Sequence, residues 1–518
     1  MRSDGNNITL SSTLTKRMKM ERLWTKFKQF LPTMPLSTAQ SSSEQNVESV
    51  DDKVKYQLIS HADEEATDLN DELFTSRLID EILDDIGLRL DHWKVFVLLC
   101  LVDITCGLGT TILSAILPSL KSDWNISAIT AGALTLSIPV GMTLGTMVWG
   151  LMSDIYGRKR SIVTSATFIL VSALVSAFST NYYWLWISLF FVGFGATISF
   201  QTYVIIAEIF PPRYRSMYSV LTVVFYNLGY LLSAVVSMEL SVIGYHWALA
   251  TVCFPSAIVL IGSIVFLPES PHFYLAAGDE QKALNILHDL APEMDFSNTI
   301  LRKHGPEIQR ADFTQLFRSG YWKITICACI ATCITYLSHG YFIYTASDVA
   351  GSSSSGLKNE ELLIRHRYTI MVWMTLPGIG LIIAAALCCK VFDARIVLLI
   401  ITLLTLVSQI IALFVANLSI PLLIVTMISR DLMLSDIALL TTCVSRVYPT
   451  EIRSLGTSAC VFAGRIGLIF GPFIFETWFS KDHFYGTVFT TVILSVLFYG
   501  SCVDAFEKLV TFKDSFHE

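Results

Sequence analysis

Charged residues are scarce in this chain of 518 amino acids. Asp, Glu, Lys and Arg together make up 15% of it, whereas soluble domains carry about a quarter. Hydrophobic residues make up 53%, and apolar runs of about 20 residues recur from Trp93 to Cys502. The composition therefore excludes an ordinary soluble domain and predicts an all-α, polytopic membrane protein that lies in the lipid bilayer.

Several chemical signatures are missing from the sequence. All 11 cysteines fall inside predicted spans, so no disulfide framework is expected. There is no phosphate-binding glycine loop with Lys, no paired metal-ligand motif, no nucleophile elbow and no pore-type selectivity repeat. These absences argue against an enzyme, a metal site, a cofactor and a channel. No nucleic-acid motif occurs, and residues 1–60 lack the apolar core of a cleavable signal peptide.

The apolar runs predict twelve membrane-spanning helices in two bundles of six. They lie near residues 93–118, 127–151, 161–180, 184–207, 218–240, 246–267, 322–346, 368–389, 395–416, 420–445, 455–478 and 485–504. We expect a largely disordered tail at 1–90, bundles at 91–268 and 322–505, a central loop at 269–321 and a C-terminal tail at 506–518. Apolar residues at helical spacing predict short surface helices at residues 78–86 and 280–290.

The loop charges predict the orientation of the chain. Lys and Arg gather mainly in the connections on one side, which are those with Arg158, Lys159, Arg160, Arg213, Arg215, Lys390, Arg395, Arg446 and Arg453. By the positive-inside rule this side faces the cytoplasm, so the three non-membrane segments and both termini are expected there. The sequence leaves open whether the membrane is the plasma membrane or that of an intracellular vesicle.

One turn between two apolar runs carries an unusual pattern of residues. It reads Gly150-Leu-Met-Ser-Asp154-Ile-Tyr-Gly157-Arg158-Lys159-Arg160, and Gly157 could adopt the positive φ that a tight turn needs. The pattern resembles the loop signature of the major facilitator superfamily, Gly-x-x-x-Asp-x-x-Gly-Arg-Lys. The alternative is an ordinary basic turn at the end of a membrane span.

The two predicted bundles repeat each other. The segment 208–216 follows the fourth span, and the related segment 446–454 follows the tenth. Arg215 and Arg453 are equivalent positions, with an offset of 453 − 215 = 238. Duplicated six-span halves are typical of transporters whose substrate site lies between the halves near the membrane midplane.

Several further blocks resemble the synaptic vesicle 2-related proteins and, more distantly, organic-ion and sugar transporters of the same superfamily. They include Ile86-Gly-Leu-Arg-Leu-Asp-His-Trp93, Val192-Gly-Phe-Gly195, Phe225-Tyr-Asn-Leu-Gly229 and Leu267-Pro-Glu-Ser-Pro271. The resemblance implies twelve helices, alternating access and a small organic solute as substrate, with coupling to protons or another ion left open. A monomer is the expected oligomeric state, although no motif in the sequence specifies it.

The second half departs from this pattern at its cytoplasmic turns. Arg158 and Glu208 could pair across the ends of the second and fourth spans, but the position equivalent to Glu208 is Arg446. The basic turn there is reduced to Asp393-Ala-Arg395. The predicted cytoplasmic gate, which comprises Gly150, Asp154, Gly157, Arg158, Lys159, Glu208 and Arg215, is therefore intact in the first half and rebuilt or weakened in the second.

Charged and polar residues inside the spans are the candidates for binding a solute or a coupling ion, because charge in the bilayer is costly. Asp103 could be a counter-charge or a proton-coupling carboxylate, and Arg465 could pair with it or hold an anion. The full set is Asp103, Gln201, Tyr226, Asn227, His339, Arg430, Asp436 and Arg465. For each, a structural role such as an ion pair or an interhelical hydrogen bond is the alternative.

These observations favour a secondary active transporter of a small organic solute, most naturally an organic ion, that works by alternating access. The alternative is a protein of transporter fold whose main role is interaction or trafficking. That reading is motivated by the altered second half and the long polar tail.

Overall fold

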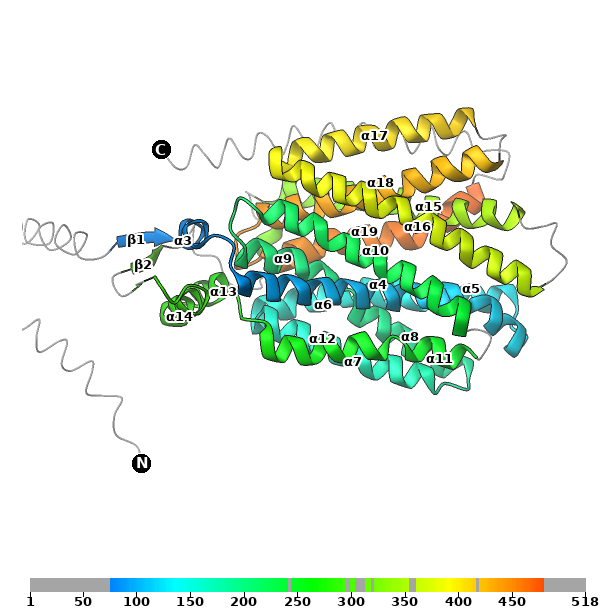
Figure 1. The fold of residues 1–518 in the computed structure, drawn as a ribbon, viewed down its shortest axis with the longest axis horizontal. Coiled ribbons are helices and arrows are strands. Elements are labelled where there is room, and N and C mark those ends of the chain that lie inside the picture. Colours follow the sequence, from blue (N-terminus) through cyan, green and yellow to red (C-terminus); the bar gives the residue numbers. More distant parts are fainter. Residues whose placement is uncertain are drawn as a thin grey trace, which may run out of the picture. The chain divides into compact units, whose positions relative to one another are not determined.

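The structure is a computed structural model that describes residues 75–240, 244–294, 296, 299–302, 313–317, 321–353, 360–415 and 419–478. Within these ranges, long helices run side by side and form one bundle (Figure 1). The predicted twelfth span at 485–504 and both chain ends lie outside the described residues.

The first half of the bundle matches the six spans predicted there. Its helices are α4 (Leu90–Trp124), α5 (Ala128–Thr135), α6 (Ser137–Tyr156), α7 (Arg158–Ala177), α8 (Tyr182–Ala196), α9 (Ser199–Ile209), α10 (Arg215–Leu240), α11 (Tyr245–Ala250) and α12 (Cys253–Phe266). The second, fourth and sixth spans are each divided into two successive helices by a short break. Side chains define some starts: Ser127 accepts a hydrogen bond from Thr130 N, and Asn181 accepts one from Tyr183 N.

The described part of the second half contains five helices. They are α15 (Trp322–Ser353), α16 (Glu360–Val391), α17 (Ala394–Phe414), α18 (Ser419–Val447) and α19 (Arg453–Trp478). By length and composition, seven described stretches could cross a membrane: Leu90–Leu113, Thr130–Tyr156, Arg158–Ala177, Tyr182–Ile209, Arg215–Leu240, Tyr245–Phe266 and Ala394–Ala412. Helix α18 is not among them, and it carries Arg430, Asp431 and Asp436 along its length.

The two halves meet along two helix pairs, α6 with α19 and α10 with α16. Gly150 permits the first contact, because a Cβ atom there would lie 2.1 Å from the Ser458 hydroxyl. Each half also has its own buried apolar cluster. The halves are therefore separately packed bodies joined by helices that approach closely.

A small layer of short elements lies at one end of the bundle (Figure 1). It consists of β1 (Thr75–Leu78), α3 (Ile79–Ile86), α13 (Pro271–Ala276), α14 (Glu280–Leu290) and β2 (Thr299–Arg302), and we call it the basic-end layer. The basic end is the end of the bundle that carries the connections near residues 157, 211 and 450. A separate buried apolar cluster, to which α3 contributes Ile79, Ile82, Leu83 and Ile86, holds the layer together.

The layer both agrees with and departs from the sequence prediction. The surface helices expected at 78–86 and 280–290 are α3 and α14. The strands β1 and β2 were not predicted; they pair in parallel, with Thr75 opposite Thr299 and Leu78 opposite Arg302. The sequence placed residues 75–90 in a largely disordered tail with this one surface helix near its end, and in the structure they also form β1 and the start of α4.

Replacing Gly157 with Ala should destabilise the turn between α6 and α7. Gly157 has φ +106°, where side chains are strained, and an added Cβ would lie 2.3 Å from the Glu269 carboxylate. Gly278→Ala is the matched control, because Gly278 has φ +82° and nothing within 4 Å of an added Cβ. We expect a larger fall in the thermal midpoint of the purified protein for Gly157→Ala than for Gly278→Ala. Equal falls would show that Glu269 moves aside without cost.

Candidate functional site

A central cavity of about 80 Å³ lies between the two halves of the bundle. Helices α4, α9 and α10 line it from the first half, and α15, α18 and α19 from the second. The lining residues are Asp103, Ser199, Phe200, Tyr203, Val223, Tyr226, Tyr230, Tyr336, His339, Leu434, Ile437, Thr441, Val461, Arg465 and Leu468. Its position at the interface of duplicated halves is the place predicted for a substrate site.

Asp103 brings a buried carboxyl group to this cavity. Its side chain is 3% exposed, and the Thr202 hydroxyl donates a hydrogen bond of 3.4 Å to Oδ2. Among the described residues, no Lys, Arg or His nitrogen lies within the 4.0 Å of an ion pair with Asp103. A buried carboxylate without a paired cation is costly, so Asp103 is suited to take up a proton or to face a cationic ligand.

Arg465 faces the same cavity from α19. Its guanidinium carbon lies 5.3 Å from the centroid of the Tyr336 ring, within the range of a cation–π contact. Its Nε atom is buried and has no hydrogen-bond partner among the residues that the structure describes. Asp103 and Arg465 therefore share one cavity without forming the ion pair that the sequence left open, and both remain available to a ligand.

Aromatic side chains surround these two charges. Tyr226 and Tyr230 lie one turn apart on α10, with ring centroids 5.1 Å apart, and the Tyr226 hydroxyl is 3.3 Å from Thr110 Oγ1. His339 is 4% exposed, and its Nδ1 atom has no hydrogen-bond partner within the described ranges. Tyr226 and His339 are among the site residues predicted from the sequence, whereas Tyr203 and Tyr230 are not. The spacing of four residues between Tyr226 and Tyr230 was a signal that both lie on one helix face.

Three other predicted candidates lie outside this cavity. Gln201 sits between α6 and α19, where it accepts a 3.0 Å hydrogen bond from Ser153 and donates one to Ser454. Asn227 lies at the contact of α10 with α16 and donates to the Thr375 carbonyl at 3.3 Å. Arg430 pairs with its neighbour Asp431, with 2.6 Å between Nη2 and Oδ1. Contacts between helices account for Gln201 and Asn227, and an ion pair within α18 accounts for Arg430.

Asp436 also lies outside the central cavity. It lines a separate, smaller cavity within the second half. The sequence placed Asp436 well inside an apolar helix, which is correct, but periodicity alone could not say which neighbouring helix it faces.

The predicted gating residues form a buried ionic network at the basic end. Arg158 is 2% exposed, and its Nε and Nη2 donate to the two Glu208 oxygens at 3.0 and 2.9 Å. Nη1 lies 3.0 Å from Asp154 Oδ1 and donates to the Ser153 carbonyl at 2.8 Å. The pair between Arg158 and Glu208 is thus the one predicted from the sequence, in a bidentate geometry.

The same network crosses to the second half. Asp154 Oδ2 accepts a 2.7 Å hydrogen bond from the Leu455 N–H. Arg158 Nη2 donates to the Thr450 carbonyl at 3.2 Å, and Arg453 Nη1 donates to Glu208 Oε1 at 3.3 Å. These bonds hold the halves together at the basic end, so the structure is closed there.

The Pro-Glu-Ser-Pro block contributes a further carboxylate to this end. Glu269 Oε1 accepts hydrogen bonds from the backbone N–H of Arg158 at 2.7 Å and of Lys159 at 3.4 Å. It thereby caps the first turn of α7, where the helix dipole favours negative charge. Burial raises the pKa of the Glu269 carboxyl, although these donors and Arg158 oppose the rise.

Arg215 has a different partner from its equivalent in the second half. Arg453 binds Glu208, and the mirrored acceptor for Arg215 would be position 446, which is Arg. Instead, Arg215 Nη2 lies 2.6 Å from Asp80 Oδ1 of α3, and Nε donates to the Phe210 carbonyl at 2.7 Å. The basic-end layer therefore supplies the negative charge that the second half lacks.

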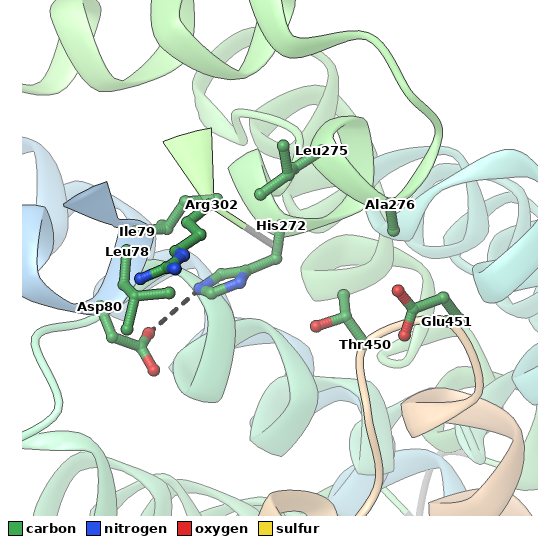
Figure 2. A pocket seen from close by; sticks show the side chains of 9 residues that line it. All are labelled: Leu78, Ile79, Asp80, His272, Leu275, Ala276, Arg302, Thr450 and Glu451. Carbon is green, nitrogen blue, oxygen red and sulfur yellow. Dashed lines mark ion pairs between the residues drawn. The ribbon is translucent and has the colours of Figure 1, made fainter. Parts of the chain in front are cut away.

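Figure 2 shows Asp80 beside His272 in a small cavity between the basic-end layer and the 450–451 turn. His272 Nε2 lies 3.2 Å from Asp80 Oδ1. Burial alone would raise the pKa of Asp80, but the hydrogen bond with His272 and the charge of Arg215 outweigh it and hold this pKa well below its usual value. Burial lowers the pKa of His272, although the hydrogen bond and the negative charge of Asp80 act to raise it. Asp80 is therefore ionised at neutral pH.

Comparison with known proteins places these features in a wider group. A family model described as Major Facilitator Superfamily matches residues 99–472. The chain is 25% identical over 445 residues to the synaptic vesicle 2-related protein of Pongo abelii, covering 82% of this chain and 78% of that protein. It is 30% identical over 184 residues to organic cation/carnitine transporter 7 of Arabidopsis thaliana, covering 35% of this chain and 36% of that protein.

A solved structure has the same fold. The proton:xylose symporter XylE, bound to 6-bromo-6-deoxy-D-glucose, aligns over 79% of this chain and 94% of its own, with a TM-score of 0.63. The sequence identity is 15%, so this likeness concerns the fold alone.

Asp80→Asn should weaken the basic end, because Arg215 would keep its buried charge without an ionised partner. We expect a loss of about 1 kcal/mol in the free energy of unfolding at neutral pH, the range for a charge-assisted bond that is partly exposed. Since the pKa of Asp80 is lowered in the folded protein, this contribution is present at neutral pH and shrinks as the pH falls below about 3.9. Asp84→Asn, on the exposed side of α3, is the matched control.

A second variant tests the exchange of partners directly. Arg446→Glu in the Asp80→Asn background returns a carboxylate to the position that mirrors Glu208, so it should restore the lost stability. The thermal midpoint of the double variant should exceed that of Asp80→Asn. A midpoint no higher would refute the equivalence of Asp80 and position 446.

Proposed function

This chain belongs to the major facilitator superfamily, and from that premise we propose that it is a secondary active transporter that moves a small organic ion across a membrane by alternating access. The family match covers most of the chain, and relatives that share it are named as transporters. Such proteins are not enzymes.

The central cavity is the observation that carries this proposal. It is enclosed by both halves and holds Asp103 and Arg465, two buried charges without ion-pair partners among the described residues. Burying an unpaired charge is costly unless a ligand or a proton neutralises it. A solute with a charged group and an apolar or aromatic surface would match these two charges and the surrounding tyrosines.

Asp103 is our candidate for ion coupling. Protonation would remove the cost of its buried charge, and release of the proton would restore it, so proton uptake and solute binding could be linked at one site. Among the proteins of the same fold, XylE is named a proton:xylose symporter. Tyr226, His339 and Arg465 would contact the solute in this scheme.

The network around Arg158 is our candidate for the gate. The structure is closed at the basic end by hydrogen bonds between Asp154, Arg158 and Glu208 and the 450–455 segment. Opening this end requires those bonds to break while α6 and α10 move against α19 and α16. We propose that the gate comprises Gly150, Asp154, Gly157, Arg158, Lys159, Glu208 and Arg215, with the basic end and both termini in the cytoplasm.

An interaction or trafficking role is the second candidate. It is favoured by the lost mirror pair at position 446, which leaves one ion pair where duplicated halves would give two. Relatives named for synaptic vesicles are consistent with a vesicle membrane as the location.

Neutralising either central charge should abolish uptake if the proposal holds. In proteoliposomes screened with organic cations, anions and zwitterions, with and without a proton gradient, Asp103→Asn and Arg465→Gln should each lower uptake of the accepted solute by tenfold or more. Loss of a buried charge-assisted contact costs about 1.5–3 kcal/mol, which corresponds to that factor. Asp289→Asn, on the exposed face of α14, should leave uptake unchanged.

Unchanged uptake in both central variants would remove Asp103 and Arg465 from the mechanism. No uptake of any solute by the wild type, together with a cellular role that survives Asp103→Asn, would favour the second candidate.

A further inference from the structure

A second cavity lies inside the second half, between α15, α17 and α18. Its volume is about 10 Å³, which is enough for one sphere the size of a water molecule. Its polar lining consists of Thr335, Thr402, Thr405, Gln409 and Asp436. None of these residues lines the central cavity.

Asp436 is the charged group of this second cavity, and it is 1% exposed. Oδ1 lies 3.0 Å from Thr402 Oγ1, and Oδ2 lies 3.2 Å from Thr405 Oγ1. Among the described residues, no Lys, Arg or His nitrogen is within the 4.0 Å of an ion pair with this carboxylate. The side chain therefore carries a buried charge that the described protein groups leave uncompensated.

Each of the two threonine hydroxyls also lies close to a backbone carbonyl oxygen. Thr402 Oγ1 is 2.8 Å from the Leu398 carbonyl, and Thr405 Oγ1 is 2.8 Å from the Ile401 carbonyl. A hydroxyl group has one hydrogen, and in both cases the carbonyl is nearer than Asp436. Each hydroxyl can therefore give its hydrogen either to the carbonyl or to Asp436. When the hydrogen goes to the carbonyl, the threonine lone pairs face the carboxylate and can bind a cation beside it.

Gln409 gives an independent indication of a ligand. It lies one helical turn beyond Thr405 on α17 and is 0% exposed, and it lines the same cavity. Neither its amide oxygen nor its amide nitrogen has a hydrogen-bond partner in the part of the chain that the structure describes. A buried amide left unsatisfied is destabilising, and such groups in native proteins call for a bound water or ion.

We propose that this cavity binds a single Na⁺ ion on Asp436. The carboxylate, hydroxyl and amide oxygens around it are hard ligands of the kind that alkali and alkaline-earth cations prefer. One positive charge neutralises Asp436, whereas a divalent ion would leave an excess charge in an apolar interior. A proton would neutralise Asp436 as well, but it would leave the cavity and Gln409 unexplained.

The site is placed to influence the central cavity. Leu434, Ile437 and Thr441 of α18 line the central cavity, and Met433 and Asp436 of the same helix line the second one. A cation that draws α18 toward α17 would therefore act on both. This role in coupling rests on the proposed transport function, whereas binding of Na⁺ does not.

Thermal unfolding in detergent tests the binding without any transport. The midpoint of the purified full-length protein is measured in NaCl and in choline chloride at equal ionic strength. We expect Na⁺ to raise the midpoint in a saturable manner, because a ligand that binds only the folded state stabilises it. Asp436→Asn and Thr405→Val should each abolish this rise. Asp103→Asn should retain it, since Asp103 belongs to the central cavity.

Two results would overturn the proposal. One is a thermal midpoint that is identical in NaCl and in choline chloride over the whole titration. If this midpoint changes with pH but not with Na⁺, Asp436 is protonated and binds no Na⁺. The other is a Na⁺-dependent rise that persists in Asp436→Asn or, should that variant fail to fold, in Thr405→Val. Na⁺ binding with no solute uptake would instead contradict the transport function and leave the site intact.

Discussion

The buried guanidinium group of Arg158 is the constraint on which the basic end of this protein depends. At 2% exposure it has lost its water, and it is tolerable only because Glu208 and Asp154 both contact it. These carboxylates are in turn satisfied by Arg453 and the Leu455 N–H of the other half. The charges are fully paired only while the halves are together. In the alternating access proposed above, the groups that stabilise the closed state are the ones that would be exposed to water when this end opens.

The duplicated halves do not contribute equally to this arrangement. Arg453 crosses to Glu208, but Arg215, its equivalent, faces an Arg at position 446 and binds Asp80 instead. Asp80 lies on α3 and His272 lies on α13, and both belong to the basic-end layer. The bond of Arg215 to Asp80 therefore does not cross to the second half, whereas the equivalent bond of Arg453 to Glu208 joins the two halves. The layer thereby neutralises an arginine that would otherwise repel Arg446 and Arg453. Among the described residues, this leaves the pair between Arg453 and Glu208 as the single ion pair that joins the two halves at this end.

Local pattern predicted most of the helices, because runs of apolar residues and their spacing act within a few positions. The pair between Arg158 and Glu208 was also predictable, since a repeated motif placed both at the same membrane surface. The strands β1 and β2 were not, because each has four residues and they pair across more than 200 positions. The location of Gln201 and Asp436 outside the central cavity was hidden for another reason. Helical spacing shows which residues share a face but not which neighbouring helix that face meets.

Helix α18 connects the features that the two halves hold separately. One side of α18 lines the central cavity, and another side carries Asp436. Asp431 of the same helix lies very close to α16, because a Cβ atom added at Gly378 would be 2.5 Å from the Asp431 Cγ. The same Cβ would be 2.8 Å from Asn227 Nδ2 of α10, so the first half packs against this point as well. Packed groups without free space cannot move independently. A displacement of α18 at Asp436 would therefore reach the α10–α16 contact between the halves, which the proposed alternating access would have to rearrange.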